Sequence, residues 1–569
     1  MTTDRDADYR ETIPPVAPSA VEAPSRNNRI GYAAALGSGT LLGIAFLHAS
    51  AAFLAWFALV PLLLSLRERD GRWNFLMGWL AGVPWFLISC HWLRHVTWAG
   101  LIALVLFEAT WLGIWMAVSG RFHTRFRLIV FPLLWVVLET LRSKGALGFS
   151  WNQLGHLAPD DLVAVAQSWG VHGLSFLFAA SNALLAGIWV RIRNERDWLR
   201  APEGAGTLAA LPILWLGVGW FVHWTAPDPR PEGTLRVGLV QGNFEQSLKW
   251  SVPTGQALER YEALTEELLR EERVDLVVWP ESAIPDVLSR DPRLLAHLEG
   301  KVREWRTDLL FGVLDADFRR GEELAKVPLF NSAVYLEPKK TELAAKAWTA
   351  SDISRYLRGE EATPQRLSTW MPSVQASSAT AFGIPVYDKA RLLPFGEYVP
   401  FGGLIPWVQR FVETRGGGAF SAGEVGRVIR TEYGEFGMLI CFESTFPGLA
   451  RRSVLNGALA LFNLTNDAWY LQTAAARQHA LQSRFRAVET GRAVVRVANT
   501  GLSRVYLPDG SETGALPWWE PSAGAVEVPL YSHLTFQSRV GDFLGWLCMG
   551  CLALLWLLAG ESPVGTKQR

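Results

Sequence analysis

Three residues of the sequence are of types that together can carry out acyl transfer through a thiol. Cys441 ends the apolar run "GMLIC", Glu281 ends "VVWPE", and Lys389 stands in "VYDKARLLPFGE", upstream of Glu397. A carboxylate can take the proton of a thiol, the thiolate can attack a carbonyl carbon, and an ammonium group can stabilise the oxyanion that develops. The backbone N–H of Phe442, just after the cysteine, is a candidate second donor to that oxyanion.

Each of these residues alone has a plainer interpretation. A free cysteine is often a small core residue, and a single Glu or Lys on an α/β surface is usually solvated. All three, however, stand at the predicted ends of strands. Ligand sites in open α/β sheets collect at the carboxyl ends of strands, so the combination favours a catalytic site.

The candidate residues lie in a long stretch, residues 230–535, that has the pattern of an α/β domain. Short runs rich in Val, Ile and Leu, such as "LRVGLVQ", "DLLFGVL" and "LALFNLTND", end in polar residues. They alternate with helix-like stretches such as "GQALERYEALTEELLREER". Buried strands that alternate with amphipathic helices predict a layered α/β fold.

Seven apolar segments precede this domain and an eighth follows it. Each is about long enough to cross a hydrocarbon core of roughly 30 Å. They cover residues 31–47, 52–66, 74–92, 98–119, 128–141, 170–190 and 206–223, and then 542–560. Hydrophobic residues make up 50% of the chain, as expected of a membrane protein with a soluble part. We therefore expect a disordered cytoplasmic tail at 1–29, seven transmembrane helices within 30–225, and an eighth at 541–561.

Arginine placement predicts the orientation of these segments. Clusters follow the second, fourth and sixth segments; they are Arg67, Arg69 and Arg72, then Arg121, Arg125 and Arg127, then Arg191, Arg193, Arg196 and Arg200. Because basic loops stay in the cytoplasm, the N-terminus is expected inside and the 230–535 domain outside. Arg142 and Lys144, after the fifth segment, run against this pattern. For the short segments 31–47 and 52–66, one kinked element or a re-entrant pair is the alternative.

Charge and cysteine usage exclude several classes of function. Lys+Arg and Asp+Glu both number 54, so no nucleic-acid partner is indicated. The cysteines other than Cys441, which are Cys90, Cys548 and Cys551, lie in apolar segments, so no disulfide framework is expected. His479, in "RQHAL", has no second His or Cys at ligand spacing beside it, so neither a metal nor another cofactor is predicted.

Several motifs resemble those of a known family. "WPESAIP", "YDKARLLPFGEYVPF", "ICFESTFP" and "NLTNDAWY" are similar to motifs of the nitrilase superfamily, whose Glu, Lys and Cys triad would fall on Glu281, Lys389 and Cys441. With the apolar segments, "VQGNFEQSLKW" and "GFSWNQLGHL", the sequence resembles the apolipoprotein N-acyltransferase family over nearly everything after residue 30.

The resemblance implies both a fold and a reaction. The fold is a bundle of eight membrane helices that carries an αββα nitrilase-like domain on the periplasmic side of the bacterial inner membrane. In the reaction, Cys441 takes an acyl chain from a phospholipid, typically phosphatidylethanolamine. The α-amine of the S-diacylglyceryl cysteine of an apolipoprotein then attacks the thioester. Glu281 is implied as general base, and Lys389 as the group that stabilises both tetrahedral intermediates.

The resemblance also implies supporting residues. Glu397, in "PFGE", and Glu443, beside the nucleophile, are given supporting roles. Trp250, in "SLKW", matches a family position on a mobile loop near the site, with an interfacial anchor as the alternative. At 442 the family commonly has tyrosine, so Phe442 keeps an aromatic ring without the hydroxyl.

Two further segments bear on function. The apolar stretch "PFGGLIPWVQRFV", 400–412, is typical of a loop that dips into lipid beside the site, with an amphipathic packing helix as the alternative. An insertion at 339–384 separates "NSAVYLEP" from "YDK", where the family has a short turn. Two other functions remain open at this stage: a membrane-anchored amidase that hydrolyses small amides, and a non-catalytic membrane scaffold.

Overall fold

A computed structural model shows how the chain folds. It describes residues 26–122, 127–194, six positions between 213 and 224, then 230–245, 253–316, 327–339, 384–403, 406–413 and 420–560. Trp250 and nearly all of the 339–384 insertion lie outside the described residues, as do most of the 206–223 segment and of the expected tail. The last four residues of that tail, 26–29, already belong to the first helix.

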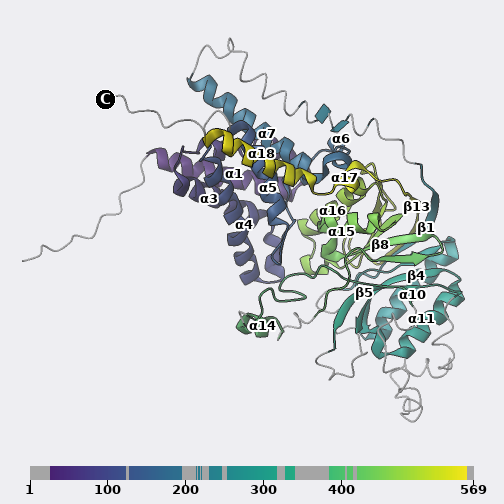
Figure 1. Ribbon diagram of the computed structural model, residues 1–569. Helices are drawn as coiled ribbons and strands as arrows, with labels where there is room; N and C mark the ends of the chain where they lie inside the picture. The colour runs from purple at the N-terminus through teal and green to yellow at the C-terminus, as the bar shows by residue number, and fades with distance from the viewer. Residues whose placement is uncertain are drawn as a thin grey trace, which may run out of the picture.

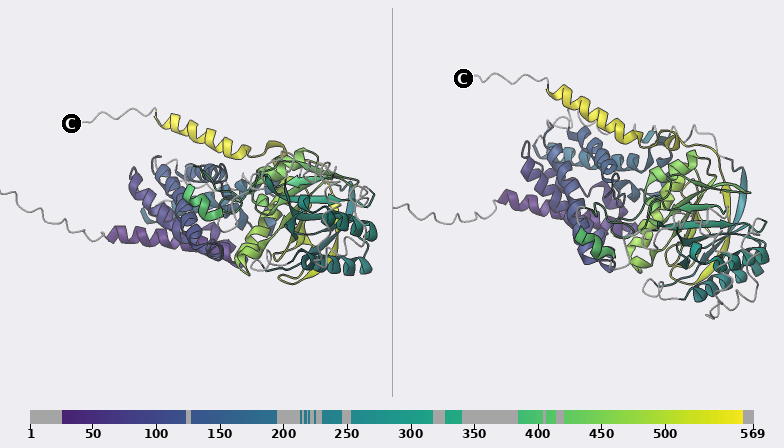
Figure 2. Two further views of the ribbon diagram at one scale, coloured as in Figure 1. Left: turned by 90° about the horizontal axis from the view of Figure 1, so that it is seen from below. Right: turned by 60° about the horizontal axis from the view of Figure 1, so that its bottom comes forward.

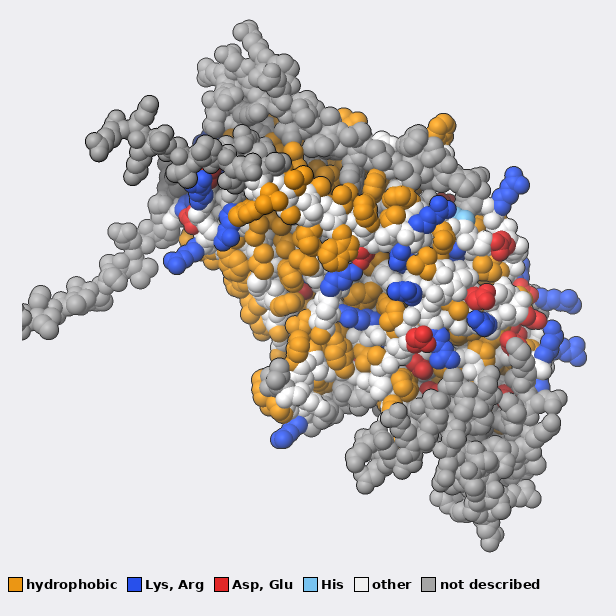
Figure 3. Space-filling view, viewed as in Figure 1, with side chains coloured by type: hydrophobic (Ala, Val, Ile, Leu, Met, Phe, Trp, Pro, Cys, Tyr) orange, Lys and Arg blue, Asp and Glu red, His pale blue; other side chains and the backbone are white. Residues whose placement is uncertain are grey.

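The described chain has two parts that lie side by side (Figure 1). One part is built from apolar helices: α1 (Arg26–Leu47), α3 (Gly71–Ser89), α4 (Trp98–Ser119), α5 (Arg127–Arg142), α7 (Ala166–Asn194) and α18 (Phe543–Gly560). The other part contains two β-sheets with flanking helices. Hydrophobic side chains gather over the helical part, whereas Lys, Arg, Asp and Glu gather over the sheets (Figure 3). This division matches the apolar and α/β halves of the sequence pattern.

Three helices of the described residues are long and apolar enough to cross a membrane by length and composition: Asn28–Leu47, Trp98–Ser119 and Ala166–Val190. The expected crossing segment at 52–66 is not one continuous α-helix: it forms a 3-10 helix, η1 (Ala49–Trp56), and a short helix, α2 (Val60–Leu64). Pro61 lacks an N–H and suits the first turn of a new helix. The count of eight crossings therefore stays a prediction.

A side chain of α7 stabilises the break between η1 and α2. Asn182 accepts a hydrogen bond from the N–H of Leu59 at 2.8 Å and donates one to the carbonyl of Ala55 at 2.7 Å. Buried backbone groups without partners are costly in an apolar environment. The amide of Asn182 satisfies two of them, which explains how this bend is tolerated inside an apolar bundle.

The two sheets face each other (Figure 1). The first has the order β13-β1-β2-β4-β5-β6, with β3 also paired to β4. Its strands are β1 (Gly233–Gln241), β2 (Leu276–Val278), β3 (Ile284–Val287), β4 (Asp308–Ala316), β5 (Leu329–Leu336), β6 (Val386–Asp388) and β13 (Ser522–Leu530). The second has the order β12-β11-β10-β9-β8-β7. Its strands are β7 (Val428–Thr431), β8 (Gly434–Ile440), β9 (Ala460–Thr465), β10 (Val494–Ala498), β11 (Arg504–Tyr506) and β12 (Glu512–Thr513).

Helices cover the outer faces of both sheets and complete an αββα sandwich. Between the sheets, one apolar core joins side chains of both, such as Leu239 and Ile440. Helices α10 (Thr254–Glu271) and α11 (Pro292–Trp305) pack on the outer face of the first sheet. Helices α15 (Pro447–Leu455) and α16 (Ala474–Thr490) pack on the second. Strands buried on both faces explain the continuous apolar runs of the sequence.

Helix α16 also contacts the helical part, so it lies between the membrane-type helices and the second sheet (Figure 2). Its Gln478 is the main polar link. The side-chain oxygen accepts hydrogen bonds from the indoles of Trp151, at 2.8 Å, and Trp92, at 3.3 Å. The side-chain nitrogen donates to the carbonyls of Phe46 and Ser89, at 3.0 and 3.1 Å. Four hydrogen bonds from one buried amide fix the sandwich against the ends of α1 and α3.

Candidate active site

The three candidate catalytic residues come together from the ends of three strands. Lys389 directly follows β6, Cys441 directly follows β8, and Glu281 lies just beyond β2. Cys441 adopts a positive φ of 53°, which is uncommon for a residue with a side chain and marks a sharp, strained turn. This turn leads from β8 into the 3-10 helix η10 (Cys441–Thr445). Glu281 and Lys389 come from the first sheet and Cys441 from the second, so the site depends on the packing of both sheets.

Lys389 lies between two carboxylates. Its Nζ is 2.8 Å from Oε1 of Glu397 and 3.7 Å from Oε1 of Glu281. Asn331, on β5, donates from its side-chain nitrogen to both of these oxygens, at 2.7 Å for Glu281 and 3.1 Å for Glu397. Burial alone lowers the pKa of Lys389, but the carboxylates of Glu397 and Glu281 outweigh burial and raise it. Lys389 is therefore a fixed ammonium group in the folded protein.

Burial and the negative charge of Glu281 raise the pKa of the Cys441 thiol to about 12, although the charge of Lys389 lowers it. A thiol with so high a pKa is a poor nucleophile until a base removes its proton. Glu281 is a carboxylate close enough to affect this pKa, so the arrangement suits general-base activation of the thiol rather than a standing thiolate.

Glu443 connects the strand that carries Cys441 to the segment that carries Lys389. Its carboxylate accepts hydrogen bonds from the N–H groups of Ile440, Ala390 and Arg391, at 2.7, 2.7 and 2.8 Å. The hydroxyl of Tyr387 lies 3.0 Å from both oxygens. Burial raises the pKa of Glu443 to about 7, although the N–H groups of Ile440 and Arg391 lower it. The position of Glu443 in the structure is that of a buried brace.

Cys441, the candidate nucleophile, lies where two apolar cores meet. Cys441 belongs to the core between the sheets, whereas its neighbour Phe442 belongs with Phe446 to the core of the helical part. That second core also contains Trp92 and Tyr470, whose rings contact each other at 4.6 Å between centroids. The surroundings of Cys441 on this side are therefore apolar and continuous with the membrane-type helices.

Other residues singled out in the sequence lie elsewhere or outside the described chain. Trp250 is not among the described residues. The 400–412 stretch is helical in part, because α14 (Pro406–Glu413) covers its second half. Its Trp407 is 74% exposed and Phe401 is 60% exposed. Figures 1 and 2 both place α14 beside the helical part. An exposed indole is unlike a packing helix and suits contact with lipid.

Sequence reasoning missed Asn331 and Tyr387, which orient the carboxylates of the site. A weak signal existed for each of them. Asn331 interrupts the apolar strand "LFNSAVYL", and Tyr387 stands directly before the Asp-Lys pair. A polar residue inside a buried strand needs partners, but only the fold shows that those partners are catalytic candidates.

Comparisons with known proteins agree with this architecture. The family model of the apolipoprotein N-acyltransferase N-terminal domain matches residues 38–184, and the carbon-nitrogen hydrolase model matches residues 236–532. The sandwich is thus a nitrilase-like carbon-nitrogen hydrolase fold. Among solved structures, Saccharomyces cerevisiae Nit3, a member of branch 10 of the nitrilase superfamily, is 17% identical with a TM-score of 0.34, covering 60% of this chain and 98% of that one.

Curated relatives match over almost the whole chain. An apolipoprotein N-acyltransferase of Geobacter metallireducens is 32% identical over 548 residues, which is 93% of this chain and 95% of the relative. One of Gloeobacter violaceus is 32% identical over 572 residues, which is 96% of this chain and 97% of the relative. The chain therefore belongs to the apolipoprotein N-acyltransferase family, a family of bacterial acyltransferases. The apolar helices are compatible with a membrane protein.

Proposed function

We propose that this protein transfers an acyl chain from a membrane phospholipid to the N-terminal α-amine of the S-diacylglyceryl cysteine of apolipoproteins. Phosphatidylethanolamine is the proposed donor. The observation that carries the proposal is the place of Cys441, between the buried Glu281 and Lys389 pair and an apolar core shared with the membrane-type helices. A site for small polar amides has no use for that continuity, and the family relationship does not favour the amidase alternative.

The first half-reaction forms a thioester. The Glu281 carboxylate takes the proton of the Cys441 thiol while the sulfur attacks the ester carbonyl of the phospholipid, forming an S–C bond. The Lys389 ammonium and the backbone N–H of Phe442 stabilise the oxyanion. When this intermediate collapses, the C–O bond breaks. The proton held by Glu281 passes to the leaving alkoxide, and a lysophospholipid departs.

The second half-reaction forms an amide. The α-amine of the apolipoprotein attacks the thioester carbonyl, and Glu281 takes a proton from the nitrogen as the N–C bond forms. Lys389 again faces the oxyanion. The C–S bond then breaks, and the proton on Glu281 returns to the sulfur of Cys441. Because the same carboxylate works in both directions, no further acid or base is required. Glu397 and Asn331 hold Lys389 and Glu281 in place throughout.

Mass spectrometry of the intact protein tests this mechanism. The purified protein is incubated with phosphatidylethanolamine that carries a labelled sn-1 chain, and then with a diacylglyceryl peptide. We expect one acyl adduct on Cys441 that disappears as labelled peptide forms. The Cys441→Ser variant is the control. Turnover of small amides without any adduct would instead favour the amidase. Equal acylation from phosphatidylglycerol would contradict only the proposed preference for phosphatidylethanolamine as the acyl donor.

We further propose that the protein spans the bacterial inner membrane several times and places the sandwich on the periplasmic side. Support comes from the two basic residues that ran against the arginine pattern. Arg142 is buried and paired with Glu108 at 3.0 Å, and Lys144 forms an ion pair with Asp542. Neither is a free loop cation, so the remaining arginines dominate the orientation signal.

Labelling in intact cells tests this orientation. Arg430 has a highly exposed side chain on the second sheet, so Arg430→Cys in a Cys441→Ser background offers an accessible thiol on the sandwich. A membrane-impermeant maleimide should label this variant in intact cells and leave the Cys441→Ser parent unlabelled. Labelling that appears only after cell lysis would contradict the periplasmic placement.

A further inference from the structure

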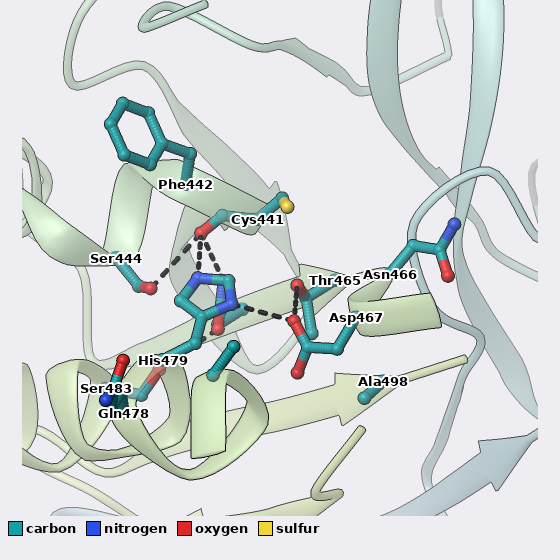
Figure 4. Close-up of polar contacts among 12 residues, drawn as sticks. Cys441, Phe442, Ser444, Thr465, Asn466, Asp467, Gln478, His479, Ser483 and Ala498 are labelled. Carbon is teal, nitrogen blue, oxygen red and sulfur yellow. Dashed lines mark hydrogen bonds and ion pairs between the residues drawn. The ribbon is translucent and has the colours of Figure 1, made fainter. Parts of the chain in front are cut away.

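A buried ion-pair network lies directly beneath the nucleophile. His479, on α16, has no exposed surface, and its Nε2 lies 3.0 Å from the carbonyl oxygen of Cys441. Its Nδ1 lies 2.8 Å from Oδ1 of Asp467, whose other oxygen accepts from Arg496 at 2.7 Å. Figure 4 shows the ring between Asp467 and this carbonyl, with the sulfur of Cys441 pointing away from the ring. Apart from Cys441, none of these residues takes part in the mechanism given above.

The partners of the ring determine how it is held. A backbone carbonyl only accepts, so Nε2 carries a hydrogen and donates to the carbonyl of Cys441. Burial raises the pKa of Asp467, but Arg496 and His479 outweigh burial and lower it, so this carboxylate is an anion beside the ring. Its short contact holds Nδ1, which Arg496 also approaches at 3.2 Å. The indole of Trp151 packs against the ring, with 5.3 Å between the ring centroids.

The geometry of the peptide bond between Cys441 and Phe442 links this contact to the Phe442 N–H, the candidate donor to the oxyanion. The carbonyl of Cys441 and the N–H of Phe442 belong to one planar trans peptide group, so they point in opposite directions. When His479 fixes the carbonyl on one side, it fixes the N–H on the side away from the ring, and the sulfur of Cys441 also points away from the ring. A donor on the carbonyl also polarises the peptide group and strengthens its N–H as a donor. The N–H of Phe442, in the first turn of η10, has no partner within that helix.

We propose that His479, oriented by Asp467, is a positioning residue that aims and strengthens the Phe442 N–H as an oxyanion donor. His479 does not touch the sulfur or the substrate and acts only through the Cys441 peptide group. A second contact supports the same carbonyl, because Ser444 Oγ donates to it at 3.1 Å. The inference rests on Cys441 as nucleophile, as proposed above, and is independent of which lipid or lipoprotein the protein uses.

Two reagents separate this role from a merely structural one. p-Nitrophenyl butyrate acylates Cys441 by attack at a carbonyl: an S–C bond forms, an oxyanion develops, and nitrophenolate leaves as the C–O bond breaks. Iodoacetamide alkylates the same sulfur by direct displacement of iodide, and no oxyanion forms. Loss of an oxyanion donor therefore slows the first reaction and spares the second. Removal of one such donor typically costs about 10²- to 10³-fold in rate.

The experiment compares two substitutions of His479 in the full-length protein in detergent. In His479→Gln, the side-chain nitrogen reaches the position of Nε2 and keeps a donor on the carbonyl of Cys441, but the contact with Asp467 is lost. In His479→Asn, the side chain is too short and keeps only the donor toward Asp467. We expect acylation by the ester to fall about 100-fold in His479→Asn and about 10-fold in His479→Gln. Alkylation and the half-saturating ester concentration should change less than about threefold.

Controls make each outcome decisive. Thr490→Val removes a buried hydrogen bond to Arg486 within the same helix and should leave both reactions unchanged. Cys441→Ser shows how much of the nitrophenolate release comes from acylation of Cys441. An equal loss of acylation and alkylation in His479→Asn, or no loss of either, would overturn the positioning role. Ester acylation of wild-type Cys441 without acylation by any phospholipid would overturn the proposed function alone.

Discussion

The substitution Glu443→Gln tests whether this carboxylate acts as a brace. In wild type, three N–H groups and the hydroxyl of Tyr387 all donate to Glu443. A glutamine of the same shape has one acceptor oxygen and one donor nitrogen. Turned one way, its nitrogen faces the N–H groups of Ala390 and Arg391. Turned the other way, it faces the N–H of Ile440 and the Tyr387 hydroxyl, which can rotate and accept.

The second orientation is the better one, and it leaves one buried N–H, that of Ile440, without a partner. An unsatisfied buried donor costs about 1–3 kcal/mol. Ile440 immediately precedes the nucleophile, so this cost falls on the alignment of Cys441 with Lys389. If the whole cost appears in the transition state, acylation slows by about 5- to 160-fold. Glu443→Ala would leave three N–H groups unpaired and threaten folding, which makes glutamine the informative change.

The assay is the rate of single-turnover acylation of Cys441 by phospholipid, followed by intact mass. Tyr387→Phe is the matched control. It removes one donor and leaves three N–H groups on an intact carboxylate, so the rate should fall less than about fivefold. The brace interpretation fails if folded Glu443→Gln acylates at the wild-type rate. It also fails if the variant loads normally and only transfer to peptide is blocked, because the carboxylate would then act in the second half-reaction.

Other expected results concern the triad and pH. Cys441→Ser should lose several orders of magnitude in transfer with an unchanged unfolding temperature, and substantial residual transfer would remove Cys441 from the mechanism. Glu281→Gln should slow acylation about 10²- to 10⁴-fold near pH 7 and recover in part as pH rises toward the thiol pKa of about 12; heavy acyl loading at pH 7 would refute the base assignment. Lys389→Met should slow acylation and transfer by about 10²- to 10³-fold each, so a defect confined to one half-reaction would contradict its role in both. Burial raises the pKa of Glu443 from 4.5 to about 7, so its contribution to stability is fully present below pH 4.5 and is lost as pH rises through 7. The unfolding temperature of wild type should therefore fall relative to that of Glu443→Gln as pH rises from 4.5 through 7, and a wild-type unfolding temperature that rises relative to the variant over this range would contradict this sign.

The sequence by itself determined which residue types stand at the ends of the apolar runs. Strands buried on both faces consist of continuous runs of apolar residues such as Val, Ile and Leu. The ends of these strands can therefore be recognised in the sequence, and Glu281, Lys389 and Cys441 stand close to them. The same local character separated the helical part from the α/β part. Family membership was also visible from sequence, because the motifs around these residues are short and contiguous. All of these features depend on neighbours along the chain.

Only the tertiary structure decided how these ends interact. Glu443 stands two positions from Cys441, yet two of its partners, Ala390 and Arg391, are more than fifty positions away along the chain, in the bend that follows β6 of the other sheet. Asn331 connects two carboxylates for the same reason. The 52–66 segment is apolar enough for a helix, but its bend depends on an amide from α7. In the sequence, no residue close to His479 indicates a function for it. In the fold, α16 packs beneath the peptide group of Cys441 and brings His479 into contact with its carbonyl oxygen. A buried polar group needs hydrogen-bond partners, and in the packed chain these partners can come from any part of the sequence. The residues next to it along the chain do not indicate which partners these are.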